Sequence, residues 1–282
     1  MDDVAWWQER AFQFTSRDFN AIRSIVRDQT GISLSDAKKD LVYNRLVKRL
    51  RSLNLDNFRS YCRLICEHDS QEMHHLINAI TTNLTAFFRE SHHFTYLGNQ
   101  LLPALIKKKN DKRIRIWSAG CSSGEEPYSI AIVLREALAQ HPGWDARILA
   151  TDLDSNVLDN AQRGIYSTEK LKGISKARLR HWFQKGKNRN HGSVRVKDTL
   201  RDIITFRQLN LMKPWPFSGP IDAIFCRNVV IYFDKPTQAT LFNRYTDLLG
   251  NPGFLFLGHS ETLFKVSTRF RPVGNTIYQI TS

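Results

Sequence analysis

The pattern of the chain changes near residue 111, and this change limits the fold more than any other feature of the sequence. From there on, short apolar segments with strand spacing alternate with segments of helical spacing. The expected strands cover 114–117, 147–151, 203–207, 223–226 and 254–257, and the expected helices cover 127–139, 155–162 and 236–249. Such alternation predicts an α/β fold, with a doubly wound, mostly parallel sheet covered by helices on both faces. The stretch 163–202 interrupts it, and its glycines and alternating valines predict a small antiparallel β-subdomain inserted in the sheet domain.

The first 82 residues show helical spacing and only weak strand signals, which predicts a small helical bundle. A capping-box pattern at Thr15 and Asp18 starts the first helix, and Gly31 stands where that helix must end. The second helix, expected after a cap at residue 35, carries a line of apolar residues on one side. Basic residues that include Arg45 and Arg49 lie on another side of it.

The chain is strongly basic, with 41 Lys and Arg residues against 27 Asp and Glu residues and a formal charge of +14. The excess lies mainly within 38–63 and 163–207, and we interpret both segments as surfaces for acidic partners, although a solvated face would explain either one alone. Hydrophobic residues make up 41% of the chain, too many for a disordered protein. No apolar run is long enough to span a bilayer, and the four cysteines form no disulfide pattern, so we expect a soluble cytoplasmic protein.

The turn after the first expected strand carries the most informative polar residues. Ligands of parallel sheets bind at the carboxyl ends of the strands. Small residues in this turn allow close approach to the backbone, while Glu125 and Glu126 at the helix entrance disfavour a pyrophosphate and suit a ligand with an amino group. Asp152 ends the second strand, where a carboxylate can accept both hydroxyls of a ribose. This pair of acids fits S-adenosylmethionine better than a dinucleotide; the structural alternative is helix capping and a surface Asp152.

The segment 83–90 joins the helical part to the rest and combines polar groups, two phenylalanines and Arg89. We interpret it as a lid over the cofactor, in which Arg89 clamps a carboxylate. A plain interdomain linker with buried phenylalanine anchors is the alternative.

Two alternative functions are compatible with the residues described so far. A methyltransferase acting on RNA or DNA would suit the basic charge, but the turn after 223–226 lacks both the Asn/Asp-Pro-Pro-aromatic and the Pro-Cys patterns of such enzymes. A cofactor-sensing signalling module without transfer activity is the second alternative. The histidines and cysteines match no zinc spacing, so we expect no metal site.

Five motifs together resemble the chemotaxis-receptor glutamate O-methyltransferase family (CheR type). They lie in order along the chain and read TTNLTAFFRE (81–90), GEEPYS (124–129), ATDLD (150–154), FCRNVVIYFD (225–234) and GHSE (258–261). The resemblance implies methyl transfer from S-adenosylmethionine to glutamate side chains of chemoreceptors during adaptation. It also implies a division of the chain into a receptor-docking helical domain over 1–82, a linker and lid over 83–110, and a methyltransferase domain over 111–282 that contains the β-subdomain over 163–202.

The resemblance further implies roles for single residues. Arg89 and Tyr232 are implied to be catalytic, as the groups that position the acceptor carboxylate. The implied cofactor contacts are Asn83, Thr85, Arg89, Glu126, Asp152, Asn210, Leu211, Arg227 and Asn228, with Glu126 preferred to Glu125 by motif position. The implied receptor contacts are Arg45, Arg49, Lys185 and Arg195. In some members of the family the β-subdomain binds a C-terminal receptor peptide as an added strand, and such members are expected to have more glycine in the loop that here holds Asn188. The implied location is the cytoplasm, with recruitment to membrane receptor arrays.

Overall fold

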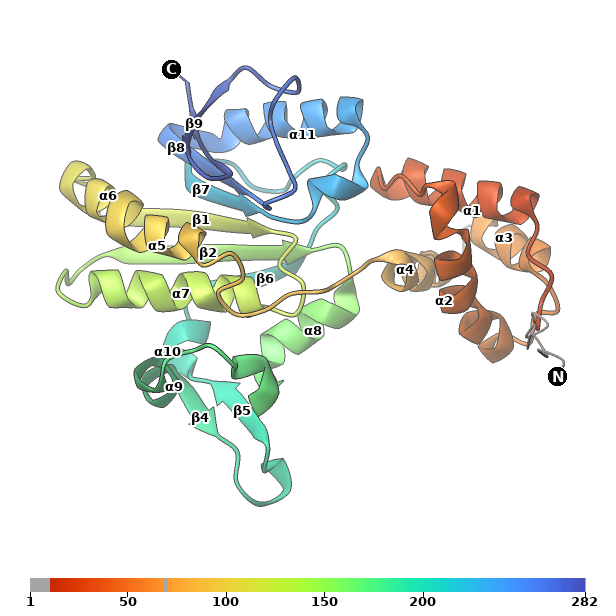
Figure 1. Cartoon of the computed structure of the whole chain (residues 1–282), viewed down its shortest axis with the longest axis horizontal. Coiled ribbons are helices and arrows are strands. Elements are labelled where there is room, and N and C mark those ends of the chain that lie inside the picture. Colours follow the sequence, from red (N-terminus) through yellow and green to blue (C-terminus); the bar gives the residue numbers. More distant parts are fainter. Residues whose placement is uncertain (1–10, 68–69, 282) are drawn as a thin grey trace, which may run out of the picture. The chain divides into compact units, whose positions relative to one another are not determined.

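The computed structural model describes residues 11–67 and 70–281, apart from the side chain of residue 70 (Figure 1). The chain divides after Thr81 into two compact units, which we describe one at a time.

The first unit is helical, as the sequence predicts. It contains α1 (Ser16–Thr30), a 3-10 helix η1 (Asp36–Lys38), α2 (Lys39–Ser52), α3 (Phe58–Cys66) and α4 (Ser70–Ile80). The capping box between Thr15 and Asp18 is present, and Gly31 ends α1 with a left-handed φ of 75°. The expected cap at Ser35 differs, because its side chain makes no capping hydrogen bond and a 3-10 turn precedes α2. The apolar line of α2 is fully buried in the core of this unit.

The second unit is built on one seven-stranded sheet. Its strands are β1 (Arg113–Ala119), β2 (Asp145–Asp152), β6 (Ile204–Gln208), β7 (Ile221–Cys226), β8 (Leu249–Leu257), β9 (Phe270–Gly274) and β10 (Ile277–Ile280). They lie in the order β6-β2-β1-β7-β8-β10-β9, in which the first five are parallel and β10 is antiparallel to both of its neighbours. The predicted parallel sheet is therefore confirmed, while the β9–β10 hairpin at its edge was not predicted.

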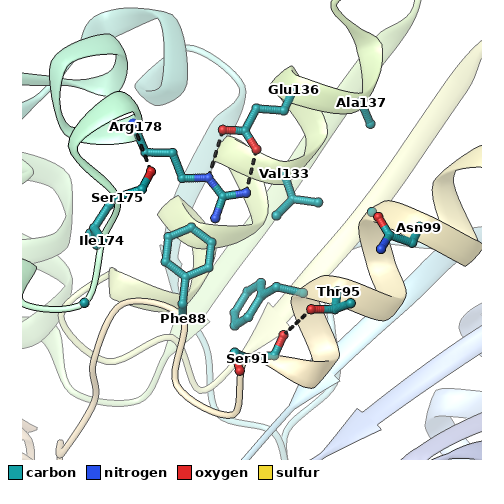
Figure 2. Close-up of a pocket in the computed structure, with 13 residues that line it drawn as sticks. Phe88, Ser91, Thr95, Asn99, Val133, Glu136, Ala137, Ile174, Ser175 and Arg178 are labelled. Atoms are coloured by element: carbon teal, nitrogen blue, oxygen red, sulfur yellow. Dashed lines mark hydrogen bonds and ion pairs between the residues drawn. The ribbon is translucent and has the colours of Figure 1, made fainter.

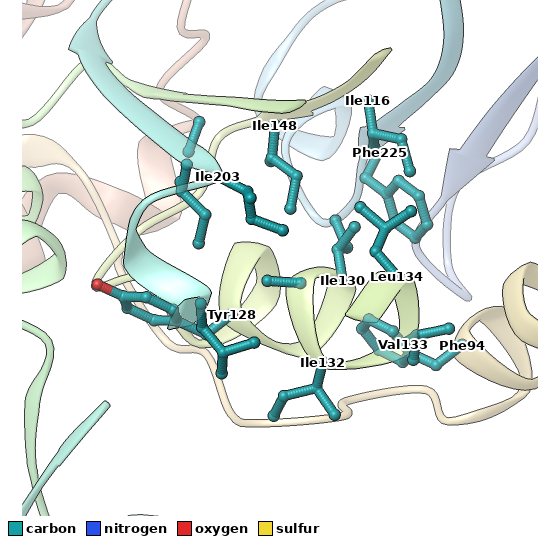
Figure 3. Packing of buried hydrophobic residues seen from close by; sticks show 14 of the residues in the cluster. Phe94, Ile116, Tyr128, Ile130, Ile132, Val133, Leu134, Ile148, Ile203 and Phe225 are labelled. Carbon is teal, nitrogen blue, oxygen red and sulfur yellow. The ribbon is translucent and has the colours of Figure 1, made fainter. Parts of the chain in front are cut away.

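Helices cover both faces of this sheet, which is why neighbouring residues of β1 belong to different cores. The helices are α5 (His92–Tyr96), a π-helical turn η2 (Leu97–Leu101), α6 (Leu102–Lys108), α7 (Glu125–Leu138), α8 (Ser155–Arg163), α10 (Asp198–Arg201) and α11 (Lys235–Leu248). Ile116 packs with α5, α6 and α7 on one face (Figure 3), whereas the next residue, Trp117, packs with α11 on the other. No helix among the described residues has the length and apolarity needed to cross a membrane.

The stretch 92–108 differs from the linker that the sequence indicated. It forms the continuous run α5–η2–α6, and its leucines are buried in the core that also contains α7. Only the part before it, 82–91, is an irregular connection. The buried residues of the run, Phe94, Leu97, Leu101 and Leu105, are three and four positions apart, so the helical period is present in the sequence although no helix was predicted here.

The inserted subdomain is a separate small sheet, as predicted. Its elements are β3 (Ile165–Ser167), η3 (Thr168–Leu171), α9 (Lys176–Trp182), β4 (Phe183–Lys185), η4 (Asn188–Asn190) and β5 (Ser193–Val196). The strands are antiparallel in the order β3-β5-β4, so β4 forms one edge. Val194 and Val196 of β5 point into the core shared with α7, which anchors the subdomain on the sheet domain.

Candidate active site

The loops that follow β1, β2, β7 and β8 meet at the carboxyl edge of the sheet, because these four strands are adjacent and parallel. The segment that precedes α5 passes this edge (Figure 1) and is hydrogen-bonded to its loops. Most of the cofactor-binding residues that the sequence predicts lie in these loops or in this segment, and the rest follow β6, the neighbour of β2.

The loop after β1 needs glycine for a steric reason. Gly120 has a left-handed φ of 97°, and a Cβ atom at this position would lie 2.3 Å from a methyl group of Val229. The amide groups of Gly120 and Cys121 both donate hydrogen bonds to the carbonyl oxygen of Thr151, at 2.8 and 2.9 Å. The first two loops of the edge are thereby fixed to each other before any ligand binds.

Asp152 lies at the end of β2 and faces the loop after β1. One of its oxygens accepts a hydrogen bond from the amide of Ser122 at 2.7 Å, and the other accepts from the amide of Asp154 at 3.0 Å. Burial raises the pKa of this carboxyl to about 6, against the hydrogen bonds, which lower it. A carboxylate oriented in this way keeps lone pairs for hydroxyl donors.

Asn83 and the start of the 83–90 segment are tied to the same two loops. The side-chain amide of Asn83 donates a hydrogen bond to Asp154 at 2.7 Å. The backbone carbonyl oxygen of Asn83 accepts one from the Ser122 hydroxyl at 3.0 Å. The structure therefore brings Asn83 and Asp152 to neighbouring positions through Ser122 and Asp154. Thr85 follows in the same segment, half-buried.

Glu125 and Glu126 are both buried, and both already have partners. Glu125 binds the Lys170 amine at 2.7 Å, whereas Glu126 accepts from the Ser118 hydroxyl at 2.7 Å and from Arg227 at 2.9 Å. Burial raises the pKa of Glu126, although Arg227 and Ser118 act in the opposite direction. The sequence predicts that an amino group of the ligand lies next to one of these acids. In the structure, the cation next to Glu126 is Arg227.

Arg227 is the centre of a buried ionic network. Its side chain is 2% exposed and forms ion pairs with Glu126 at 2.9 Å and with Glu90 at 3.4 Å. It also donates a short hydrogen bond to the carbonyl oxygen of Arg89. Burial opposes ionisation of Glu90, but Arg227 and His259 outweigh it and hold the pKa of Glu90 below its ordinary value. Sequence reasoning missed Glu90, whose only signal was its place directly after Arg89.

The backbone around Arg89 is held in an uncommon conformation. Phe88 and Glu90 both have φ of 54°, in the left-handed region that residues other than glycine rarely adopt. The amide of Phe88 donates to the Ser129 hydroxyl at 3.0 Å, and the guanidinium of Arg89 donates to the carbonyl oxygen of Leu84 at 2.8 Å. Such strain persists where surrounding contacts impose it, and it is common at functional sites.

Glu261 connects the loops after β7 and β8. Its buried carboxylate accepts amide hydrogen bonds from Gly258, from Asn228 at 2.9 Å and from Ile231 at 3.2 Å. These bonds fix Asn228, which has a φ of 59°, and the short 3-10 turn η5 (Val230–Tyr232) that carries the half-buried Tyr232. The role of Glu261 was not predicted, because its partners are backbone groups.

Asn210 and Leu211 follow β6 at the same edge. Asn210 accepts a hydrogen bond from the amide of Met212 at 2.9 Å, and the carbonyl oxygen of Leu211 accepts from the Trp215 indole at 3.2 Å and from Arg244. Both residues are thus held by local contacts in the loop next to β2.

Arg45 and Arg49, predicted as receptor contacts, both hold α4 against α2 within the first unit. Arg45 donates to the carbonyl oxygens of Ile80 and Thr81 at 2.7 and 2.8 Å. Arg49 binds both oxygens of Glu72, with the shortest contact at 2.6 Å, and Glu72 is 1% exposed. These side chains therefore have structural partners, whereas other basic residues of this region, such as Lys48, are exposed.

The predicted contacts in the β-subdomain are both exposed. Lys185 ends β4, and Arg195 lies on β5, where it forms an ion pair with Asp198 at 3.1 Å.

A three-residue cluster near the network could offer donors to a metal ion. Ligand atoms of Glu90, His92 and His93 lie within 4.8 Å of one another. Arg227, at 3.4 Å from Glu90, already compensates the charge of that carboxylate and opposes a cation there. The absence of a metal stays a prediction.

A cavity of about 480 Å³ opens next to Phe88, on the α7 side of the sheet (Figure 2). Arg178 of the inserted subdomain crosses it to bind Glu136 at 2.6 Å, with its guanidinium carbon 4.7 Å from the centre of the Phe88 ring. The described lining contains none of the predicted cofactor contacts, so we do not assign the cofactor to this cavity.

Comparisons with protein families and with related proteins indicate one family for the whole chain. Residues 83–279 match the family model described as CheR methyltransferase, SAM binding domain, and residues 17–81 match the CheR methyltransferase, all-alpha domain. A chemotaxis protein methyltransferase of Salmonella typhimurium is 44% identical over 265 residues, which cover 93% of this chain and 89% of the relative. Chemotaxis protein methyltransferase 2 of Pseudomonas aeruginosa is 44% identical, with 95% and 94% covered, and that of Escherichia coli is 43% identical, with 93% and 90% covered. The chain belongs to the CheR family of methyltransferases, and its cofactor is S-adenosylmethionine.

Proposed function

We propose that this protein transfers a methyl group from S-adenosylmethionine to glutamate carboxylates of chemoreceptors, forming methyl esters during adaptation. The observation that carries the proposal is the arrangement at the carboxyl edge of the sheet in a chain of this family. Two buried acids, Asp152 and Glu126, lie beside a segment that presents Arg89, and the neighbouring loop carries Tyr232. The names of the relatives, all chemotaxis protein methyltransferases, support the same substrate class.

Esterification of a glutamate needs no general base, because a carboxylate with an ordinary pKa of about 4.3 is already ionised at neutral pH. When bound, the cofactor supplies a methyl group on a positively charged sulfur. A carboxylate oxygen forms the new bond to this carbon as the sulfur–carbon bond breaks. The protein must position the carboxylate in line and remove its water. We assign this positioning to Arg89 and Tyr232.

We assign cofactor contacts to Asn83, Thr85, Arg89, Glu126, Asp152, Asn210, Leu211, Arg227 and Asn228. In this assignment Asp152 accepts the ribose hydroxyls. Arg227 and Glu126 act as a neutral buried pair that shapes the site, since each already has the other as its partner.

The direct test is transfer of radiolabelled methyl groups to membranes that contain a chemoreceptor, followed by brief treatment with alkali. A carboxyl methyl ester releases its label as methanol, so alkali-labile protein label is the expected result. Label that resists alkali, or label that appears in added RNA rather than in protein, would contradict the proposal.

The proposed role of Asp152 predicts a pH dependence of product binding. Ribose hydroxyls donate to the ionised carboxylate, and burial raises the pKa of Asp152 to about 6. Between pH 5 and pH 7 the ionised fraction rises about ten-fold, so the Kd of S-adenosylhomocysteine should fall about ten-fold and then level off. Calorimetric titration at several pH values measures this. The variant Asp152→Asn should bind weakly with a flat profile, whereas a flat profile of the unchanged protein would exclude Asp152 from the binding step.

The same shift has a consequence for stability. The pKa of Asp152 is higher in the folded protein than in the unfolded chain, so its contribution is fully present below about pH 4. It is lost as the pH rises through about 6, and bound product should offset that loss.

We further propose that the helical unit docks on receptors through exposed basic residues of the region 38–63, and that β4 accepts a C-terminal receptor peptide as an added strand near Lys185. Such contacts would recruit the protein to receptor arrays. Because receptor helices that carry several glutamates are acidic, encounter should be faster at low salt.

Substitutions at two neighbouring residues of α2 separate a contribution to receptor docking from a contribution to folding stability. Arg49→Met leaves Glu72 buried without its cation and should lower the free energy of unfolding by about 3 kcal/mol. Lys48→Met removes an exposed charge, and should leave stability unchanged while weakening the salt dependence of receptor methylation. Thermal unfolding of the full chain and methylation rates at two salt concentrations measure both effects. Wild-type stability of Arg49→Met together with slow methylation would instead make Arg49 a direct receptor contact.

A further inference from the structure

Four large hydrophobic side chains are exposed among the described residues, and three of them lie in the loops around the proposed transfer site. Leu84 is 79% exposed, Ile231 48% and Phe264 73%; we call these three residues the apolar rim. The fourth, Ile165, is 53% exposed and lies on β3 of the inserted subdomain. Single exposed apolar residues are ordinary, but a group around a site indicates a surface that a partner covers.

The apolar rim is connected to the proposed catalytic residues by short contacts. The carbonyl oxygen of Leu84 accepts the hydrogen bond from the Arg89 guanidinium at 2.8 Å, and Ile231 directly precedes Tyr232. Phe264 lies in the loop after β8, which Glu261 joins to the amide of Ile231 at 3.2 Å. These contacts place the apolar rim in the same loops as Arg89 and Tyr232, at the carboxyl edge of the sheet.

The charges near the apolar rim indicate what kind of partner covers it. Lys265 is exposed, and its amine lies 5.4 Å from the centre of the Phe264 ring. Together with Arg89 and the exposed Lys235, the surface combines apolar groups with cations. An acidic amphipathic helix has the matching composition, because residues three and four positions away lie on the same side of a helix as a given glutamate.

We propose that the apolar rim binds the apolar side chains that flank the acceptor glutamate on a helix of the substrate protein. The rim would then select which glutamates are methylated, since only those with apolar neighbours at helical spacing cover Leu84, Ile231 and Phe264. This inference rests on the proposed function, because it names the surroundings of the glutamate that the site accepts.

The test uses the full chain and the soluble cytoplasmic fragment of a chemoreceptor that the unchanged protein methylates. The double variant Leu84→Ser/Phe264→Ser should raise KM for this fragment at least ten-fold, and should leave kcat and the Kd of S-adenosylhomocysteine within two-fold. The matched control is Ile165→Ser, on the edge strand opposite β4, measured with a receptor fragment that lacks the C-terminal peptide; it removes a similarly exposed apolar side chain and should change neither KM nor kcat. Equal thermal unfolding temperatures establish that both variants are folded.

A second arm identifies the contact. In the receptor fragment, the apolar residues three and four positions from the methylated glutamate are replaced by serine. This change should raise the KM of the unchanged protein. It should raise the KM of the double variant little further, because the substitutions in the receptor and those in the rim remove the same contact. Additive effects would overturn the inference, as would unchanged KM of the double variant. Loss of binding to receptor-free anionic vesicles without a change in KM would assign the rim to a membrane surface instead and also overturn it. Failure of the unchanged protein to methylate the fragment would contradict the proposed function itself.

Discussion

Replacing Arg89 with alanine is expected to lower kcat/KM for receptor methylation about a thousand-fold, mainly through kcat. The Arg89 guanidinium is held by the carbonyl oxygen of Leu84, and the backbone on both sides is fixed in a left-handed conformation. Its position is therefore set before the substrate arrives, and preset positioning of this kind is among the largest contributions to a displacement reaction. Rates of methyl transfer to a soluble receptor fragment, measured at saturating and at subsaturating cofactor concentrations, separate kcat from cofactor binding.

Two further variants make this result interpretable. Arg89→Lys keeps the charge but loses the planar pair of donors, so it should recover only part of the activity. Arg269→Ala removes an exposed arginine of the same unit, which pairs with Asp247 at 3.6 Å, and should leave turnover unchanged. If Arg89→Ala turned over at a near-normal rate, Arg89 would not belong to the transfer site.

Replacing Arg227 with methionine is expected to lower the free energy of unfolding by about 3–5 kcal/mol and to remove detectable methyl transfer. The buried Glu126 and the partly buried Glu90 then lose the cation that compensates them. The carbonyl oxygen of Arg89 loses its hydrogen bond as well. Thermal or denaturant unfolding with and without S-adenosylhomocysteine measures the stability change and the loss of binding.

The pH dependence of this variant provides an internal check. Without Arg227, the pKa of Glu126 should rise further above its value in the unfolded chain, so protonation favours the folded state at low pH. The deficit in unfolding free energy should therefore shrink as the pH falls. The double variant Arg227→Met/Glu126→Gln should regain part of the stability but none of the transfer activity. A variant Arg227→Met with wild-type stability would show that the ionic network contributes little.

The alternating pattern of the sequence was sufficient to predict the five parallel strands and the helices between them. β1, β7 and β8 contain buried apolar runs, and β2 and β6 alternate buried with exposed residues. The hairpin of β9 and β10 was missed, since its strands are short and largely exposed on one side. β9 and β10 show neither a buried run nor a clear alternation, so the local pattern did not mark them as strands.

The predicted site residues show where sequence reasoning stops. Acids at the entrance of α7 were read as partners of a charged ligand, but the cation that Glu126 contacts comes from Arg227, 101 positions further along the chain. In the same way, the spacing that predicts Arg49 as a receptor contact does not reveal its ion pair with the buried Glu72, which lies on another helix. Residue type and spacing identify which side chains can carry charge; only the fold determines which charges neutralise one another.

The edge of the large sheet has a consequence for how copies of the protein behave when they are crowded. The outer strand β9 carries Arg271 and Pro272 at exposed positions, and proline has no amide hydrogen to offer a neighbouring chain. An edge of this composition resists pairing with the same edge of another copy, so crowding should not cause polymerisation through β9. Copies held at a high local concentration would then still exchange freely.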